Sequence, residues 1–74
     1  SPYYFIKLFK EETDQNIVEY LTSLRVEKAK EMLTSPSASI KEICMAVGYS
    51  DPNYFSRIFK KVTGQTPTEY RDRI

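Results

Sequence analysis

The sequence predicts an all-α domain, and three observations support this class. Apolar residues recur at helical spacing along most of the chain, and no segment alternates with the two-residue period of a strand. Only two glycines are present, and 41% of residues are hydrophobic against 28% charged, which is typical of an ordered domain. A chain of 74 residues buries barely enough apolar surface to fold alone, so one small domain is expected.

Composition excludes several kinds of site. Histidine is absent and Cys44 is the only cysteine, so the sequence offers neither an internal disulfide nor a zinc site. Without histidine, the usual general base and the usual partner of a serine or cysteine nucleophile are missing, and we expect no enzyme activity, cofactor or metal. No apolar run is long enough to span a membrane and no charged-then-apolar leader opens the sequence, which favours a cytoplasmic protein.

The chain contains an internal repeat at a spacing of fifty residues. Nine of the first twenty residues are identical to the residue fifty positions later, where average usage gives about one identity. Convergent helix patterning explains shared periodicity but not identical residues. The second copy is preceded by the segment 39–49, which has no counterpart before Ser1, so we expect the first copy to be truncated. The identical pairs are Pro2/Pro52, Tyr4/Tyr54, Phe5/Phe55, Phe9/Phe59, Lys10/Lys60, Thr13/Thr63, Gln15/Gln65, Glu19/Glu69 and Tyr20/Tyr70.

Residues 2–13 are expected to form a first helix, followed by a turn at Asp14. Asn16 and Glu19 resemble a capping box and open a long helix over about 17–34, which a proline-containing loop ends. The apolar face of this long helix is expected to comprise Ile17, Leu21, Leu24, Ala29, Met32 and Leu33. Residues expected in the core elsewhere are Phe5, Leu8, Phe9, Val47, Tyr49, Phe55, Ile58 and Phe59.

The remaining residues predict two helices that meet at a tight turn. A capping box at Ser39 opens a helix over 40–47, which Gly48 ends. A second helix is expected over 52–63, followed by a short helix that contains Tyr70. Two helices of these lengths have the proportions of a helix-turn-helix, whose second helix enters a major groove of DNA.

Charge is segregated along the second of these helices. Between Asn53 and Thr68 the chain carries three basic residues and no acidic one, although its formal net charge is only +1. Such segregation is typical of a surface that faces phosphates. The three basic residues are Arg57, Lys60 and Lys61.

One long motif carries a resemblance to a known family. It reads Ile40-Lys-Glu-Ile-Cys-Met-Ala-Val-Gly-Tyr-Ser-Asp-Pro-Asn-Tyr-Phe-Ser-Arg-Ile-Phe-Lys-Lys-Val-Thr-Gly-Gln-Thr-Pro-Thr-Glu-Tyr-Arg71 and resembles the signature of the AraC/XylS family of transcription regulators. Upstream, the family's first reading helix and linker helix resemble Tyr4-Phe5, Phe9-Lys10, Tyr20-Leu21 and Arg25-Val-Glu-Lys-Ala-Lys-Glu-Met-Leu33. The resemblance implies an all-α, homeodomain-like helix-turn-helix domain. Its parts are 1–15, the recognition helix of a truncated first helix-turn-helix; 16–38, the linker helix and loop; and 39–74, a complete second helix-turn-helix.

The resemblance also implies which side chains meet DNA. Arginine donates two hydrogen bonds to one guanine and asparagine pairs with adenine, each worth about 1–3 kcal/mol of discrimination, while isoleucine suits a thymine methyl group. The base-reading candidates are Asn53, Ser56 and Arg57 in the second reading helix, and Tyr3, Ile6 and Lys7 at the matching positions of the first. The phosphate-contact candidates are Lys10, Ser39, Tyr54, Lys60 and Lys61.

The predicted function is sequence-specific binding of double-stranded DNA by a bacterial transcription regulator, with RNA polymerase as a further partner of the intact protein. The linker helix of eighteen residues spans about 27 Å. Successive major-groove faces lie roughly 34 Å apart, so one monomer is expected to read two turns, with bending of the DNA as a further hypothesis.

The alternative function is a helical protein-interaction or oligomerisation module that uses the apolar face of the first helix and does not bind DNA.

Three smaller expectations concern side chains outside the reading helices. Because the first copy of the repeat is truncated, its apolar residues lose cover, and the first helix should be frayed, displaced or packed against another copy. Arg71 and Arg73 are expected to be tail charges, with a structural ion pair as the alternative for Arg71 because it belongs to the matching motif. A solvated face of the linker helix is expected to carry Arg25, Lys28 and Lys30, with Glu27 and Glu31 close enough for helical pairs.

Overall fold

The computed structural model describes residues 2–13 and 16–73, without side-chain detail at positions 9, 12 and 13, and consists in these ranges of five α-helices. The all-α prediction is confirmed, and each predicted helix boundary lies within one residue of the observed one. The turn expected at Asp14 and the burial expected for Phe9 lie outside what the structure describes. The helices are α1 (Pro2–Thr13), α2 (Ile17–Leu33), α3 (Ile40–Ala46), α4 (Pro52–Thr63) and α5 (Pro67–Asp72).

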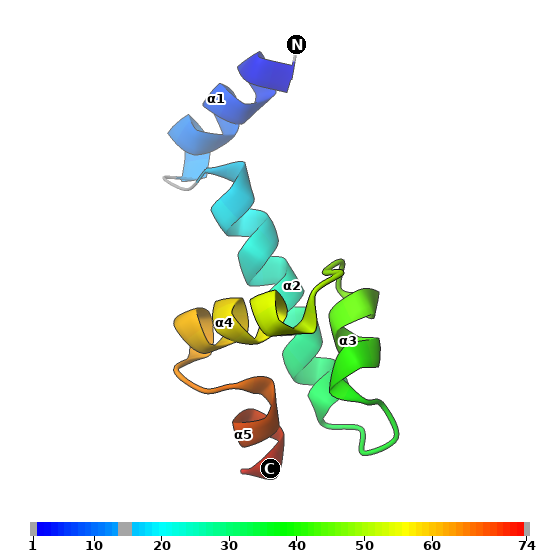
Figure 1. The fold of residues 1–74 in the computed structure, drawn as a ribbon. Helices are drawn as coiled ribbons and strands as arrows, with labels where there is room; N and C mark the ends of the chain where they lie inside the picture. Colours follow the sequence, from blue (N-terminus) through cyan, green and yellow to red (C-terminus); the bar gives the residue numbers. More distant parts are fainter. Residues whose placement is uncertain (1, 14–15, 74) are drawn as a thin grey trace.

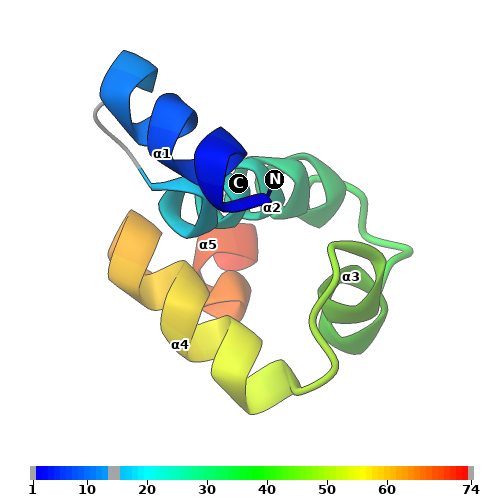
Figure 2. The same ribbon diagram turned by 90° about the horizontal axis from the view of Figure 1, so that it is seen from above.

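Helix α2 runs down the middle of the molecule, below α1 in Figure 1, and contacts each of the other helices. Helices α3, α4 and α5 gather around its C-terminal half, whereas α1 lies at its N-terminal end (Figures 1 and 2). This arrangement gives an elongated molecule of 41 × 21 × 19 Å. None of the helices within the described ranges is both long and apolar enough to cross a membrane.

A single hydrophobic core joins α2, α3, α4 and α5. Phe55 and Phe59 of α4 are fully buried, with ring centroids 5.9 Å apart, and the ring of Tyr70 from α5 packs against Phe59 in an edge-to-face arrangement with centroids 5.6 Å apart. Burying each of these phenylalanines contributes about 1.5–3 kcal/mol, so the two residues anchor α4 to the core. The other buried hydrophobic residues of this core are Val26, Ala29, Leu33, Ile43, Cys44 and Val47.

Four residues that were expected in the core are exposed instead. Phe5 and Leu8 of α1 are 56% and 41% exposed, and Leu21 and Leu24 of α2 are 44% and 48% exposed. The prediction for them is wrong because α3 and α5 lie at the C-terminal half of α2 (Figures 1 and 2), and α4 reaches the N-terminal half only along the side that carries Val18 and Thr22. On the C-terminal half, Val26 is buried although the sequence pattern did not single it out.

Side-chain caps begin four of the five helices. Ser39 and Thr66 form complete capping boxes with Glu42 and Glu69. The side chain of Asn16 accepts a hydrogen bond from the Glu19 N–H at 2.8 Å. The Glu19 carboxylate in turn accepts from the side-chain amide of Asn16, whereas in a complete capping box it accepts from the backbone N–H. The fourth cap is Asp51, which accepts from the Asn53 N–H at 3.0 Å.

Arg71 closes the C-terminal end of α2 and is neither a free tail charge nor a member of the ion pair expected as the alternative. Its Nε donates to the carbonyl of Leu33 at 3.2 Å, and its Nη2 donates to the carbonyl of Ser35 at 3.1 Å. The last carbonyls of a helix lack hydrogen-bond partners within the helix and carry a partial negative charge. A guanidinium supplies both the missing donors and a compensating positive charge. Arg71 therefore ties α5 to the end of α2.

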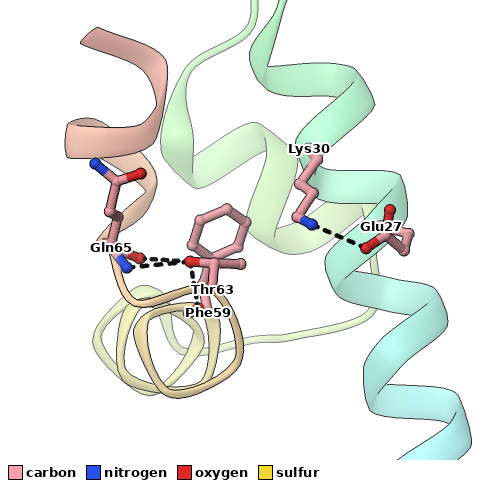
Figure 3. A network of polar contacts seen from close by, with 5 residues as sticks. All are labelled: Glu27, Lys30, Phe59, Thr63 and Gln65. Atoms are coloured by element: carbon pink, nitrogen blue, oxygen red, sulfur yellow. Dashed lines mark hydrogen bonds and ion pairs between the residues drawn. The ribbon is translucent and has the colours of Figure 1, made fainter. Parts of the chain in front are cut away.

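The connection from α4 to α5 is held by the hydroxyl group of Thr63 (Figure 3). The hydroxyl oxygen lies 2.8 Å from the Phe59 carbonyl and 3.0 Å from the Gln65 carbonyl, and it accepts from the Gln65 N–H at 3.2 Å. Because a hydroxyl has one hydrogen, it donates to one of these carbonyls at a time. These contacts fix the direction in which the chain leaves α4 and returns α5 to the core.

Two glycines end helices in the left-handed region and give a paired prediction. Gly64 has φ 86° and Gly48 has φ 104°. Alanine at position 64 would meet no atom within 4 Å, so we expect Gly64→Ala to cost only the backbone strain, about 1–2 kcal/mol. Alanine at position 48 adds a contact of 3.2 Å with Cζ of Arg25, and a larger loss of stability is expected. Urea unfolding of the two variants measures the difference, and equal losses would contradict the close approach of Arg25.

Candidate nucleic-acid interface

The turn between α3 and α4 fixes the direction of α4. The N–H of Gly48 donates to the Met45 carbonyl at 3.2 Å and the N–H of Tyr49 donates to the Cys44 carbonyl at 3.0 Å, the two bonds of a Schellman motif. The Cys44 thiol donates to the Tyr49 carbonyl at 3.3 Å. Burial, with a smaller effect from the charge of Asp51, raises the pKa of this thiol and keeps it protonated. Helices α3 and α4 thus form a helix-turn-helix with α4 in the place of the recognition helix.

The side of α4 that faces away from the buried phenylalanines carries four of the predicted DNA contacts. Asn53, Arg57 and Lys60 are exposed and Ser56 is partly buried. Their spacing of i, i+3, i+4 and i+7 places them on one helix face, here called the outer face of α4. The acidic cap of Asp51 marks where this face begins.

Tyr54 and Lys61 lie beside the outer face, at the edge of a groove between α4 and the N-terminal half of α2. The ring centroids of Tyr54 and Tyr49 lie 5.9 Å apart, while Tyr54 remains 45% exposed. Tyr54 therefore combines a packed ring with an accessible surface, as expected of an amphipathic side chain. The groove is also lined by Val18, Glu19, Thr22, Ser23, Ile58 and Val62.

The candidates of the first reading helix gather on α1 in the same pattern. Tyr3, Ile6, Lys7 and Lys10 repeat the spacing of the outer face of α4, and all four are exposed. Tyr3 is 77% and Ile6 41% exposed. The structure does not bring this set together with the residues of α4, because α1 lies at the N-terminal end of α2 (Figure 1).

Ser39, the remaining phosphate candidate, has its hydrogen-bonding groups engaged in the capping box of α3. Its hydroxyl accepts from the Glu42 N–H at 3.0 Å, and its own N–H donates to the Glu42 carboxylate at 3.1 Å. The hydrogen bond that the Ser39 N–H donates to the carboxylate, with a smaller effect from the Ser39 side chain, lowers the pKa of Glu42 below its ordinary value, so the carboxylate is ionised at neutral pH. A phosphate approaching Ser39 would meet this negative charge, which makes Ser39 the weakest of the phosphate candidates.

Arg25 is a further residue for which the prediction from the sequence was wrong. It was expected on a solvated face of α2, but it is partly buried, and its Cζ lies 5.1 Å from the centroid of the Tyr49 ring. The expectation failed because the turn of the helix-turn-helix packs across this part of α2, and no local sequence pattern marks that contact. The helical pairs expected on α2 are present: Lys28–Glu31 at 3.4 Å, and Lys30–Glu27 at 2.9 Å, the second of which is drawn in Figure 3.

The fold and its exposed basic helix agree with comparisons to known proteins. Residues 1–73 match the family described as a helix-turn-helix domain of the AraC type. The chain belongs to the AraC family of transcription regulators. It is 45% identical over 68 residues to the HTH-type transcriptional activator RhaR of Mannheimia succiniciproducens, covering 92% of this chain and 25% of that protein. It is also 45% identical over 73 residues to the uncharacterized transcriptional regulatory protein YesN of Bacillus subtilis, covering 96% of this chain and 20% of that protein.

Solved structures of this AraC-type fold include two that bear on function. The C-terminal domain of AraT, a response regulator from Geobacillus stearothermophilus, matches with a TM-score of 0.94 and 40% identity, over 100% of this chain and 61% of that chain. The DNA-binding domain of AdpA, solved in complex with a target DNA, matches with a TM-score of 0.90 and 25% identity, over 99% of this chain and 66% of that chain. The prediction of a DNA-binding domain from a transcription regulator is confirmed.

The relatives also bear on the expectation that this domain is not an enzyme. They are mainly transcription regulators, which agrees with a non-enzymatic domain, although AdaA of Bacillus subtilis is described as a bifunctional transcriptional activator and DNA repair enzyme. The chain spans a quarter of the length of RhaR and a fifth of the length of YesN.

Proposed function

We propose that this AraC-type domain reads DNA sequence by inserting the outer face of α4 into a major groove. The observation that carries the proposal is the exposure of Asn53, Arg57 and Lys60 on the side of α4 opposite a fully buried anchor. In this assignment Arg57 donates two hydrogen bonds to a guanine and Asn53 pairs with an adenine, while Ser56 contacts a base at the edge of the face. The Schellman turn and the buried phenylalanines hold α4 rigidly, which such hydrogen bonds require.

Phosphate contacts on either side of the groove hold the helix in register. Lys60 and Lys61 supply two positive charges near the C-terminal end of α4, and Tyr54 supplies a polar edge. Lys10 plays the same part for α1, and Ser39 is retained as the least supported of these contacts. Such contacts contribute affinity without sequence preference, and the affinity falls as salt rises.

Helix α1 is proposed as the reader of an adjacent groove, through Tyr3, Ile6 and Lys7. The proposed division is therefore a reading helix in 1–15, a linker in 16–38 and a complete helix-turn-helix in 39–74. Helix α2 has 17 residues and spans about 26 Å. This is shorter than the roughly 34 Å between successive major-groove faces, so binding by both helices is expected to bend the DNA. A permuted-site gel assay measures the bend.

In the protein at its natural length, we propose that this domain adjusts promoter use by RNA polymerase. Relatives named as transcriptional activators support that role. The proposed reading residues need neither a metal nor a cofactor, and the place of action is the cytoplasm, where bacterial DNA lies.

The experiment that tests the proposal is a fluorescence-anisotropy titration of the protein onto random duplex DNA at several salt concentrations. We expect log K to fall linearly with log salt, and Lys60→Ala together with Lys61→Ala to reduce the slope by about 0.9 for each phosphate that is no longer neutralised. Lys28→Ala is the matched control, because Lys28 pairs with Glu31 on α2. Absence of binding at low salt would reject the proposal and leave the protein-interaction alternative, for which the exposed aromatic residues of α1 would be the contact surface.

A further inference from the structure

Arg25 belongs to α2, outside the helix-turn-helix, yet its guanidinium lies directly on the turn that joins α3 to α4. A Cβ placed on Gly48 would lie 3.2 Å from Cζ, 3.3 Å from Nε and 3.4 Å from Nη2 of Arg25. The same group lies 5.1 Å from the centroid of the Tyr49 ring, within the range of a cation–π contact. The neighbouring Val26 is fully buried in the core, which fixes the backbone from which Arg25 projects.

Tyr49 connects this guanidinium to the first turn of the reading helix. The centroid of its ring lies 5.9 Å from that of Tyr54 and 5.6 Å from that of Phe55. Its carbonyl accepts a hydrogen bond from the Cys44 thiol. The ring of Tyr49 therefore lies close both to the guanidinium of Arg25 and to the aromatic side chains of the first turn of α4, the helix that carries Asn53 and Arg57.

We propose that Arg25 is a positioning residue for DNA reading, which acts through Tyr49 to hold α4 at the angle that the base contacts require. The proposal rests on the proposed function of α4. A guanidinium suits this task because it is planar, stacks on an aromatic ring and fits against the bare backbone of a glycine. Arg25 in this way couples the orientation of the linker helix to that of the second reading helix.

The competing role for a partly exposed arginine is a direct phosphate contact, and salt dependence separates the two. Removing a phosphate contact lowers the salt slope of log K by about 0.9 and weakens binding to all sequences alike. Removing a positioning contact leaves the slope unchanged and weakens binding to the preferred sequence more than to random DNA, because only base contacts depend on the angle of α4. A loss of folded protein would weaken both kinds of binding by the same factor.

The test uses the protein at its natural length, a random duplex, and a duplex that the protein has enriched from a random pool, here called the selected duplex. Arg25→Met keeps the aliphatic stem and removes the guanidinium, and Lys28→Met is the matched loss of one charge from the same helix. We expect Arg25→Met to raise Kd for the selected duplex at least tenfold, to lower the ratio of selected to random affinity, and to leave the salt slope within the error of the wild type. A lower slope with an unchanged ratio, or an Arg25→Met protein that behaves like Lys28→Met, would overturn the proposal.

Two substitutions at Tyr49 test the route through the ring. Tyr49→Phe keeps the aromatic face and is expected to bind like the wild type. In a Tyr49→Leu background, Arg25→Met is expected to raise Kd by less than twofold, because its partner is already absent. An undiminished loss of affinity in that background would show that Arg25 acts elsewhere. If circular dichroism shows that Tyr49→Leu does not fold, Arg25→Lys and Arg25→Met are compared in the wild-type background instead. Arg25→Met is expected to lower the ratio of selected to random affinity. Arg25→Lys keeps the charge without the planar group, and it is expected to restore less than half of that lost ratio.

The proposed function and this proposal fail in different ways. If the wild-type protein binds no duplex, the function of α4 is rejected. The positioning role of Arg25 is then tested by NMR chemical shifts. Arg25→Met is expected to move the amide signals of Gly48, Tyr49 and Asn53, whereas Lys28→Met is expected to leave them in place. Unmoved signals would overturn the positioning role independently of DNA.

Discussion

Phe55→Ala is expected to destabilise residues 1–74 by about 3–5 kcal/mol. Phe5→Ala, at the equivalent position of the repeat, is expected to cost less than about 1 kcal/mol in the same chain. The two residues are the same in type and in place within their copies, but Phe55 is fully buried whereas Phe5 is 56% exposed. The loss in free energy of unfolding comes from the cavity left behind and from the removed packing of the ring. We therefore attribute the difference in loss between the two variants to burial and not to other differences between the two copies.

Urea unfolding followed by circular dichroism measures both variants. A domain of this size has a free energy of unfolding of about 4–11 kcal/mol, so Phe55→Ala is expected to remove between about a quarter and all of it. Phe55→Leu, with a smaller cavity, provides a folded intermediate point if the alanine variant unfolds entirely. Equal destabilisation by Phe5→Ala and Phe55→Ala would contradict the exposed position of Phe5.

The contrast between these two phenylalanines also explains how much of the fold the sequence predicts. Helix bounds follow from local signals, namely the capping residues, prolines and glycines, and the predicted bounds agree with the structure to within one residue. Periodicity identifies which side of a helix is apolar, but it does not say whether another element covers that side. The prediction that Phe5 and Leu21 are buried is therefore wrong, because no core-forming helix surrounds that end of α2.

The two arginines that sequence reasoning misplaced show a second limit. Arg25 contacts the ring of Tyr49, and Arg71 donates to the carbonyls of Leu33 and Ser35. Neither partner carries a charge, and each lies more than twenty residues away along the chain, so charge spacing on one helix does not indicate the contact. The pairs of Lys28 and Lys30 were predictable because their partners stand one turn away on the same helix.

The candidate site was predictable to a different extent on each reading helix. On α4 the sequence indicated both the apolar side, from its periodicity, and the basic side, from the absence of acidic residues. The structure places these on opposite sides of one helix, which agrees with the proposed outer face. On α1 the spacing of the candidates is the same, but the helix is not anchored by a buried phenylalanine among the described side chains, and its reading role stays a prediction.

Arg57→Ala is expected to raise Kd for the selected duplex by about 5- to 150-fold, the equivalent of removing one bidentate base contact worth about 1–3 kcal/mol. Because Arg57 is assigned to a base, the effect is expected to depend on sequence: preference at one base pair disappears, and affinity for random duplex changes little. Lys60→Ala is the matched comparison on the same outer face. It is expected to weaken binding to selected and random duplexes by a similar factor and to lower the salt slope by about 0.9.

Titration of both variants against the selected duplex, its single-base variants and random DNA at several salt concentrations separates the two roles. If Arg57→Ala lowered the salt slope and left base preference intact, Arg57 would be a phosphate contact and base reading would have to come from other residues of α4. Arg57→Lys makes the distinction sharper, because it keeps the charge but removes the planar fork that pairs with guanine. An Arg57→Lys protein with the wild-type salt slope but without the base preference would establish that Arg57 reads a base through its geometry and not through its charge.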